Sequence, residues 1–424
     1  MNVPVERTFA EQQDAADPLA SLRAEFFIPQ RERGGDSVYL CGHSLGLQPR
    51  GVARVLNEEL KHWAELAVEG HFASSRPWLP YHEQLTNSLA KLTGAQPLEV
   101  VAMNSLTVNL HLMLASFYRP RPGRAAILVE QTAFPSDQYA VASQIKYHGF
   151  DPNTALIEIG PRAGEDVLRT DDICSLIERE GQRIATVMLP GVQYLTGQRF
   201  DIAAITRCAR RQGCTVGFDL AHAIGNVPLR LHDWDVDFAV WCSYKYLNAG
   251  PGAIGGCFVH ERHARALDLP RFAGWWGHDK QSRFQMPATF QPIAGAEGWQ
   301  LSNPPILAAA PLLASLPLFD AAGMDGLRAK SLRLTAYLQS ILEARLSQSL
   351  TVTTPSDPEA RGCQLSIRLR RSSTEARAAF DALAEQGIFC DWREPDIIRV
   401  APVPLYNSFL DVWQFVAALE QALQ

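Results

Sequence analysis

The stretch SYKYLNAGPG (residues 243–252) places one lysine, Lys245, between two tyrosines and ahead of a glycine-rich turn. The apolar run DFAVWC (237–242) precedes it, and the β-rich run AIGGCFV (253–259) follows it. Two such runs separated by turn residues predict two strands with a connection between them. An amine buried in that connection is costly unless it has a partner or a chemical role. The alternative is a lysine with only a structural role.

Strand-like and helix-like runs alternate through the middle of the chain. Strands are expected at 125–130, 185–192, 214–219, 236–243 and 252–259, and helices at 170–181 and 201–213. This alternation predicts an α/β fold in which helices cover a mostly parallel sheet.

The C-terminal third has a different pattern. A long helical region is expected over about 305–348, followed by strands at 364–370 and 397–404 and helices at 374–386 and 408–422. These elements predict a smaller α+β domain. We therefore expect an N-terminal segment that packs with the small domain (1–65), a large domain (66–310) and the small domain itself (311–424).

Composition narrows the class of protein. The formal net charge of −6 argues against nucleic acid or an anionic membrane as the main partner. The N-terminus is acidic and lacks an apolar signal region, so we expect a cytoplasmic protein. Eight cysteines are scattered without a C-x-x-C pair, which favours free thiols over disulfides or a metal site.

Three features are expected at the carboxyl ends of the strands, where open α/β sheets place their sites. Asp219 ends the run TVGFD, and Lys245 follows the next strand. Asn104 or Ser105 can cap a helix whose first turn contains Leu106 and Thr107, and a helix N-terminus attracts phosphate.

Together these features suggest pyridoxal phosphate. The lysine amine forms a Schiff base with the cofactor aldehyde, and a buried carboxylate keeps the pyridine nitrogen protonated. Each feature alone has an ordinary explanation, since Asp219 could cap a helix and the helix start could be a good cap. The joint occurrence of the three features indicates pyridoxal phosphate more specifically than any one of them alone.

A competing motif is GPGAIG (250–255), which fits the dinucleotide-binding pattern G-x-G-x-x-G. That site requires a helix after the glycines, whereas a β-like run follows them here. A nicotinamide-dependent dehydrogenase is therefore a weak alternative. The histidines and acids are not spaced as a metal site, and none is predicted.

Beyond these features, the chain resembles the kynureninase family of fold-type I pyridoxal-phosphate enzymes over nearly its whole length. The motifs that carry the resemblance are GHSLGLQP (42–49), GHFASSRPW (70–78), NSLTVNLH (104–111), FPSD (134–137), LPGVQYLTGQ (189–198), FDLAHAIGN (218–226), SYKYLNAGPG (243–252), GWWGH (274–278), SNPP (302–305) and RVAPVPLYNSF (399–409). The resemblance implies an aspartate aminotransferase-like fold whose large domain has a seven-stranded sheet. It also implies hydrolysis of L-kynurenine, or of its 3-hydroxy analogue, to the anthranilate and L-alanine in tryptophan degradation.

The resemblance also implies roles for individual residues. Lys245, Tyr244 and Asp219 would be catalytic, with Lys245 as the Schiff-base lysine. The cofactor would be bound by Leu106, Thr107, Phe134, Pro135, Ser136, Asp137, Asp219, His222, Tyr244, Lys245, Trp275 and Asn303. The substrate would be bound by Ser44, His71, Asn303 and Arg399, with Arg399 holding the α-carboxylate.

The resemblance further implies a homodimer with shared active sites, in which Trp275 and Asn303 come from the second subunit. Trp276 follows Trp275, so either tryptophan could be the one that contacts the cofactor. Pro190 stands where some members have a phosphate-binding serine.

Two rival functions remain open at this point. The nearest is another fold-type I enzyme such as a cysteine desulfurase, which needs a mobile cysteine. The other is a non-catalytic relative, against which the joint presence of Lys245, Asp219 and Arg399 argues.

Overall fold

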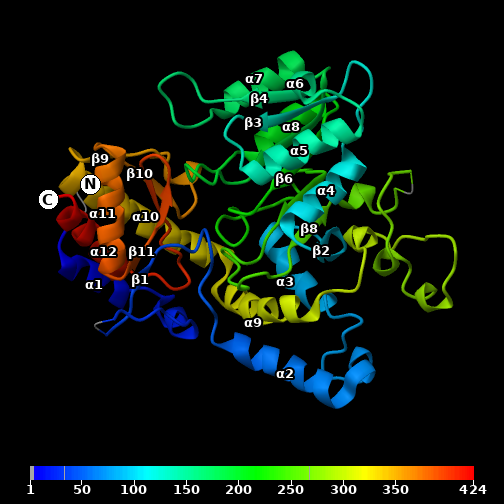
Figure 1. Cartoon of the computed structure of the whole chain (residues 1–424), viewed down its shortest axis with the longest axis horizontal. Coiled ribbons are helices and arrows are strands. Elements are labelled where there is room, and N and C mark those ends of the chain that lie inside the picture. Colours follow the sequence, from blue (N-terminus) through cyan, green and yellow to red (C-terminus); the bar gives the residue numbers. More distant parts are fainter. Residues whose placement is uncertain (1–3, 33, 267) are drawn as a thin grey trace.

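A central sheet organises the larger part of the chain (Figure 1). The computed structural model describes residues 4–32, 34–266 and 268–424. The strand order is β2 (Val100–Ala102), β8 (Gly256–Val259), β7 (Phe238–Trp241), β6 (Thr215–Asp219), β5 (Ile184–Pro190), β3 (Ala126–Glu130) and β4 (Leu156–Ile159). Neighbouring strands from β4 to β7 pair in parallel, and β8 pairs antiparallel with both β7 and β2. The predicted α/β fold with a mostly parallel seven-stranded sheet is confirmed.

Helices surround this sheet and continue into the rest of the chain. The α-helices are α1 (Arg7–Ala15), α2 (Gly51–Leu66), α3 (Glu83–Thr93), α4 (Leu106–Phe117), α5 (Pro135–Tyr147), α6 (Pro152–Ala155), α7 (Thr170–Glu180), α8 (Ile202–Arg211), α9 (Ile306–Ala322), α10 (Met324–Leu346), α11 (Ser373–Glu385) and α12 (Phe409–Ala422). The short 3-10 helices are η1 (Ala20–Glu25), η2 (Ala67–His71), η3 (Pro97–Glu99), η4 (Glu261–His263), η5 (Trp275–Gly277), η6 (Arg283–Gln285), η7 (Ala296–Trp299) and η8 (Pro358–Ala360).

Both faces of the sheet are buried, because successive side chains of a strand point to opposite sides. In β3, Leu128 packs in the same apolar cluster as Ile173 of α7. Its neighbours Ile127 and Val129 pack instead with Leu110 of α4. This arrangement explains why the strands are continuous apolar runs rather than alternating ones.

A second, smaller group of elements lies at the other end of the molecule (Figure 1). Its antiparallel sheet has the order β12 (Asp391–Arg393), β13 (Ile397–Val400), β10 (Leu365–Leu369) and β9 (Leu350–Val352). α10, α11 and α12 share an apolar cluster with these strands.

The N-terminal segment contributes to this group. β1 (Val38–Tyr39) pairs in parallel with β11 (Ile388–Phe389). The Asp14 carboxylate accepts hydrogen bonds from the backbone N–H groups of Phe409 and Leu410, at 2.7 and 2.9 Å. Asp14 therefore caps the first turn of α12. Unlike α1 and β1, α2 does not pack chiefly with the smaller group, because most of its contacts are with α9.

The helical region that the sequence predicts over about 305–348 is two helices rather than one. Gly323 separates α9 from α10 with a φ of +68°, and the two helix axes differ by 80°. A positive φ suits glycine because it lacks a Cβ. Among the described residues, no single helix is both long and apolar enough to cross a membrane, and only α9 and α10 taken together across their bend reach that length and composition.

A buried ion pair joins the N-terminal segment to α10, and we expect its loss to destabilise the fold. Lys330 Nζ lies 2.7 Å from Asp17 Oδ2, and both side chains are almost fully buried. Lys330→Ala would leave the Asp17 carboxylate buried without its cation, at a cost of about 3–5 kcal/mol in the free energy of unfolding. Urea denaturation measures this change.

The matched control is Lys61→Ala, which removes an exposed lysine 3.9 Å from Glu65. Such surface pairs contribute less than about 1 kcal/mol. Equal denaturation midpoints for the Lys330→Ala and Lys61→Ala variants would contradict the stabilising role of the buried pair.

Candidate active site

One pocket at the carboxyl edge of the large sheet contains most of the predicted cofactor residues. Its wall is formed by Leu106, Thr107, Glu130, Phe134, Ser136, Asp137, Pro190, Val192, Tyr194, Asp219, Ala221, His222, Tyr244 and Lys245. Of the predicted cofactor-binding residues, only Pro135, Trp275 and Asn303 are outside this wall. Pro135 begins α5, directly between two residues of the wall.

Lys245 projects into this pocket from the connection between β7 and β8. Its Nζ lies 3.1 Å from Nε2 of His222, within hydrogen-bond distance. Burial, followed by the charge of Lys245, keeps the pKa of His222 well below its usual range. His222 is therefore a neutral imidazole within hydrogen-bond distance of the lysine amine.

Asp219 ends β6, and its position depends on a close approach between two strands. A Cβ atom on Gly217 would lie 2.1 Å from the Phe238 ring of β7, so glycine lets these strands pair. The backbone N–H of Ala221 donates to Asp219 Oδ1 at 2.7 Å. The carboxylate is thereby fixed at the bottom of the pocket.

Asp137 and Asp219 form a coupled pair of buried carboxyl groups. Burial and the negative charge of Asp219 raise the pKa of Asp137 well above its usual range. Burial also raises the pKa of Asp219, whereas Lys245 and the N–H of Ala221 lower it. Lys245 and the N–H of Ala221 thus favour the ionised form of Asp219, whereas the charge of Asp219 favours the protonated form of Asp137. Oδ1 of Asp137 is buried without a hydrogen-bond partner among the described residues, which leaves it free for a ligand.

Glu130 is a pocket residue that the sequence analysis missed. It ends β3, is buried, and receives only a long hydrogen bond of 3.4 Å from Gln193 Nε2. Burial raises its pKa to about 8, with a further increase from Asp219. The sequence did offer a signal for Glu130, because it is the last residue of the predicted strand at 125–130 and sites lie at the carboxyl ends of strands.

The part of the pocket around Thr107 and Ser136 has the features of a phosphate site. α4 begins at Leu106 and α5 begins at Pro135, so two helix N-termini meet there. Thr107 Oγ1 lies 2.8 Å from Ser136 Oγ, which places two hydroxyl groups together. Unpaired N–H groups and the helix dipoles favour an anion at this position.

The glycines of the competing motif have a different role from dinucleotide binding. Gly255 N–H donates to Asn104 O at 2.7 Å, and a Cβ on Gly255 would lie 3.2 Å from the backbone nitrogen of Leu106. The strand β8 follows immediately, not a helix. The motif therefore brings β8 close to the start of α4.

Phe134 offers a free aromatic face at the mouth of the pocket. Its side chain is 40% exposed, and its ring contacts the Tyr194 ring edge-on at 5.3 Å. Lys245 Nζ lies 5.8 Å from the Phe134 ring centre. Phe134 thus lines the same pocket as the two aspartates and has an exposed part that a flat ring could contact.

Arg399 is buried near the pocket but outside its wall. Its guanidinium pairs with Asp391 Oδ2 through Nε at 2.7 Å and Nη2 at 2.6 Å, and Nη1 donates to Tyr194 O at 2.6 Å. A guanidinium has five N–H groups. One N–H on each of Nη1 and Nη2 therefore remains for a further acceptor.

The other predicted substrate and cofactor residues are outside the pocket of the single chain. Ser44 lies in an exposed turn, and Asn303 is exposed ahead of α9. His71 ends η2 and packs against Trp78 at 5.3 Å. Trp275 is 42% exposed, whereas Trp276 is 1% exposed. Of the two tryptophans, Trp275 is thus the one available to a ligand or a second chain.

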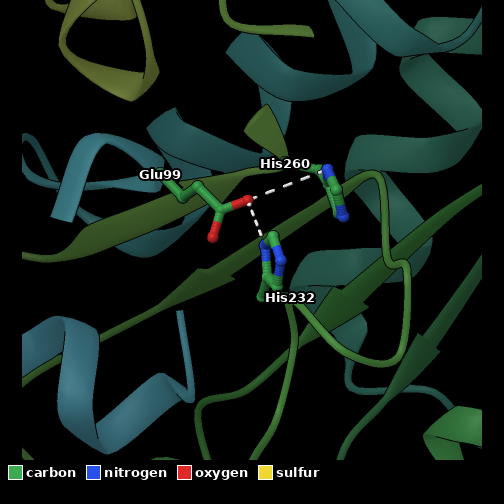
Figure 2. Close-up of side chains that lie close together, drawn as sticks. All are labelled: Glu99, His232 and His260. Atoms are coloured by element: carbon green, nitrogen blue, oxygen red, sulfur yellow. Dashed lines mark hydrogen bonds and ion pairs between the residues drawn. The ribbon is translucent and has the colours of Figure 1, made fainter. Parts of the chain in front are cut away.

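A separate cluster of metal-binding residue types lies beside β8 (Figure 2). Glu99 Oε1 is 3.0 Å from Nδ1 of His232 and 3.7 Å from Nδ1 of His260. The two imidazole rings stack at 5.0 Å and are nearly parallel, so a single ion cannot lie in both ring planes. The backbone N–H groups of Glu261 and Arg262 donate to Glu99 and His260. The contacts are those of a hydrogen-bonded structural cluster.

The pocket fits pyridoxal phosphate on three counts. It contains the amine of Lys245, a pair of carboxyl groups with one unpartnered buried oxygen, and two helix N-termini with the hydroxyl groups of Thr107 and Ser136.

The fold agrees with this fit. The chain matches the cystine C-S lyase C-DES with a TM-score of 0.75 at 19% identity, covering 91% of this chain and 97% of that one. It matches the cysteine desulfurase CsdA from Escherichia coli with a TM-score of 0.73 at 19% identity, covering 96% and 98%. The protein has the fold and the site of a fold-type I pyridoxal-phosphate enzyme.

Sequence relatives identify the family within this class. The family model for the kynureninase C-terminal domain matches residues 327–419. Kynureninase of Koribacter versatilis is 59% identical over 408 residues, 96% of each chain. Kynureninase of Myxococcus xanthus is 60% identical over 97% of this chain and 96% of that one. Kynureninase of Xanthomonas campestris is 57% identical over 99% of each. The chain belongs to the kynureninase family.

Proposed function

We propose that this chain hydrolyses L-kynurenine, or its 3-hydroxy analogue, to the anthranilate and L-alanine. The observation that carries the proposal is the pocket itself, in which Lys245 and the Asp137–Asp219 pair face each other on a chain of this family. When bound, pyridoxal phosphate withdraws electrons from the α-carbon of the substrate, which makes the bond between its β- and γ-carbons easier to break.

The pocket residues divide the work of holding the cofactor. Asp219 would pair with the ring nitrogen and keep it protonated, and Asp137 would lie near the same edge of the ring. Thr107 and Ser136 would hold the phosphate together with the N-termini of α4 and α5. Phe134 would stack on one face of the ring.

Lys245 and its neighbours move protons. Lys245 would hold the cofactor through its amine and, in its free form, would accept the proton from the α-carbon of the substrate. His222, at 3.1 Å, keeps an uncharged acceptor next to that amine. Burial raises the pKa of Tyr244, so its phenol remains a proton donor at neutral pH. Tyr244 positions the water that attacks the γ-carbonyl group.

Arg399 orients the substrate. Its two remaining N–H groups form the fork that binds a carboxylate bidentately. Asp391 already balances its charge and fixes the guanidinium plane. The α-carboxylate of the amino acid is the acceptor that matches this fork.

The cysteine desulfurase alternative lacks its nucleophile. Cys363 and Cys390, the two cysteines of the C-terminal part, are both buried. Burial raises the pKa of Cys363 to about 12 and that of Cys390 well above its usual range. Neither thiol provides the exposed thiolate that attacks sulfur.

The test of the function uses the purified protein loaded with pyridoxal phosphate. L-kynurenine and 3-hydroxy-L-kynurenine are supplied in parallel, and the anthranilate products are followed by fluorescence, with L-cysteine as the comparison substrate. We expect anthranilate and an equal amount of L-alanine from at least one kynurenine. Sulfide from L-cysteine with no anthranilate from either kynurenine would overturn the proposal.

We further propose that two copies of the chain form a dimer. Trp63 of α2 is 61% exposed and shares a groove with Leu307 of α9. Phe72, the residue after η2, is also exposed. His71 and Asn303, two of the predicted substrate residues, adjoin Phe72 and α9 along the chain. An exposed apolar surface of this kind typically marks an interface. A second copy would cover it and bring exposed site residues against another pocket.

Light scattering tests the dimer. We expect a molar mass twice that of the single chain, and a shift toward the single-chain mass in Trp63→Glu, because a buried charge at an interface is costly. The control is Tyr147→Glu, at the exposed end of α5. A wild-type protein with the mass of one chain at micromolar concentration would contradict the dimer.

A further inference from the structure

His43 is a buried imidazole for which the proposed mechanism has no use. Its side chain is 0% exposed, and neither Nδ1 nor Nε2 has a hydrogen-bond partner among the described residues. Leaving a buried polar group unpaired destabilises the folded state. Such a group in a native structure calls for an explanation, and a ligand that pairs with it only when bound is one.

The backbone holds His43 in place independently of its side chain. His43 lies in the turn at 41–46, where Gly46 N–H donates to Tyr244 O at 2.8 Å. A Cβ on Gly46 would lie 2.3 Å from Lys245 O, so the turn packs directly against the lysine connection. Cys41 forms a bridge with Ala401, two residues after Arg399. The turn therefore joins the lysine loop to the strand that bears the arginine.

The surroundings of His43 are cationic. Its ring lies 6.5 Å from the His222 ring, which in turn contacts Lys245. Burial, and then the charges of Arg399, Lys245 and Arg393, keep the pKa of His43 well below its usual range. The imidazole is thus neutral, with one N–H donor and one acceptor. An anion is the ligand that suits this site, because it can accept the free N–H of His43 and is attracted by the cationic side chains around it.

We propose that His43 donates a hydrogen bond to the α-carboxylate of the substrate amino acid, next to the fork of Arg399. This inference rests on the proposed function and adds a binding residue to it. The carboxylate has more than two lone pairs, so it accepts from His43 and from both N–H groups of Arg399 together. His43 is 0% and Arg399 is 1% exposed, so a carboxylate can reach them only when the side chains that enclose them move.

A ligand pair separates this role from a structural one. L-alanine carries the α-carboxylate and ethylamine lacks it, and binding of each to the holoenzyme is followed by the cofactor absorbance. A hydrogen bond to a charged group contributes about 1.5–3 kcal/mol, so His43→Leu should weaken L-alanine binding about 10- to 100-fold. Ethylamine binding should change less than about twofold. Arg399→Lys should likewise weaken the binding of L-alanine more than the binding of ethylamine.

Two further variants complete the test. His43→Gln keeps an N–H donor and should recover most of the affinity for L-alanine. His148→Leu removes a histidine at the end of α5 and should bind both ligands as the wild type does. Should His43→Leu fail to fold, His43→Ala replaces it, because alanine has no side-chain donor and should show the same selective loss.

Equal changes for L-alanine and ethylamine, or unchanged binding of both, would overturn the role of His43. These binding measurements do not depend on cleavage of the kynurenine carbon–carbon bond. A failure of the proposed function, seen as no anthranilate from the wild type, is therefore distinct from a failure of this inference.

Discussion

Lys245→Ala should reduce the steady-state formation of anthranilate about ten-thousand-fold. The substitution removes both the covalent attachment of the cofactor and the group that moves the α-proton, and positioned acid–base groups alone contribute about 100- to 10,000-fold. The remaining pocket, including His222 at 3.1 Å from the lost amine, should still bind the cofactor through its phosphate. Product fluorescence under multiple turnovers measures the rate.

The control variant is Lys146→Ala, an exposed lysine near the end of α5, which should keep wild-type activity. Borohydride reduction followed by mass spectrometry supplies a second readout. We expect the cofactor mass on the peptide that contains residue 245 in the wild type and no adduct in Lys245→Ala. Multiple turnovers at more than about a hundredth of the wild-type rate would contradict the assignment of Lys245.

Asp219→Asn should reduce kcat about 100- to 1,000-fold, while the fold is retained. The amide oxygen can still accept from the N–H of Ala221, so the geometry is preserved and only the negative charge is lost. That charge faces a developing positive charge on the ring, and removal of one such preorganised electrostatic contact typically costs this factor. The cofactor absorbance should shift as its ring nitrogen loses the proton.

Asp137→Asn is the matched comparison, because it changes the other half of the same pair. Burial and the charge of Asp219 raise the pKa of Asp137 and favour its protonated form, so we expect an uncharged amide to replace an uncharged acid. We expect a loss of less than about tenfold in kcat and little change in absorbance. The reverse order of effects, with Asp137→Asn the more damaging, would show that the negative charge resides on Asp137.

Local sequence patterns predicted the parts of the site that follow directly from a strand or a helix start. Asp219 and Lys245 each come at or just after a buried strand, and Leu106 and Thr107 open α4, so their common edge followed from the parallel sheet. Glu130 was missed because a glutamate that ends an apolar run also looks like an ordinary strand terminus. His43 gave no signal, since only the packed turn reveals that its ring is buried and unpaired.

Other expectations depended on contacts that a single chain does not make. Trp275 and Asn303 were predicted for the cofactor site on resemblance alone, and in one chain both are outside the pocket.

The break at Gly323 was also not predicted, because the apolar pattern continues across it while the backbone turns. Periodicity reports which face is buried and does not report the direction in which the chain leaves a helix.

The contacts between the N-terminal segment and the C-terminal third have a consequence for synthesis of the protein. Asp14 caps α12 and β1 pairs with β11, so these two contacts cannot form until the C-terminal third of the chain has been synthesised. The large sheet can assemble beforehand, since domains generally fold as units as they appear. The smaller unit is therefore completed after the large sheet, and a chain truncated before α12 lacks the helix that Asp14 caps.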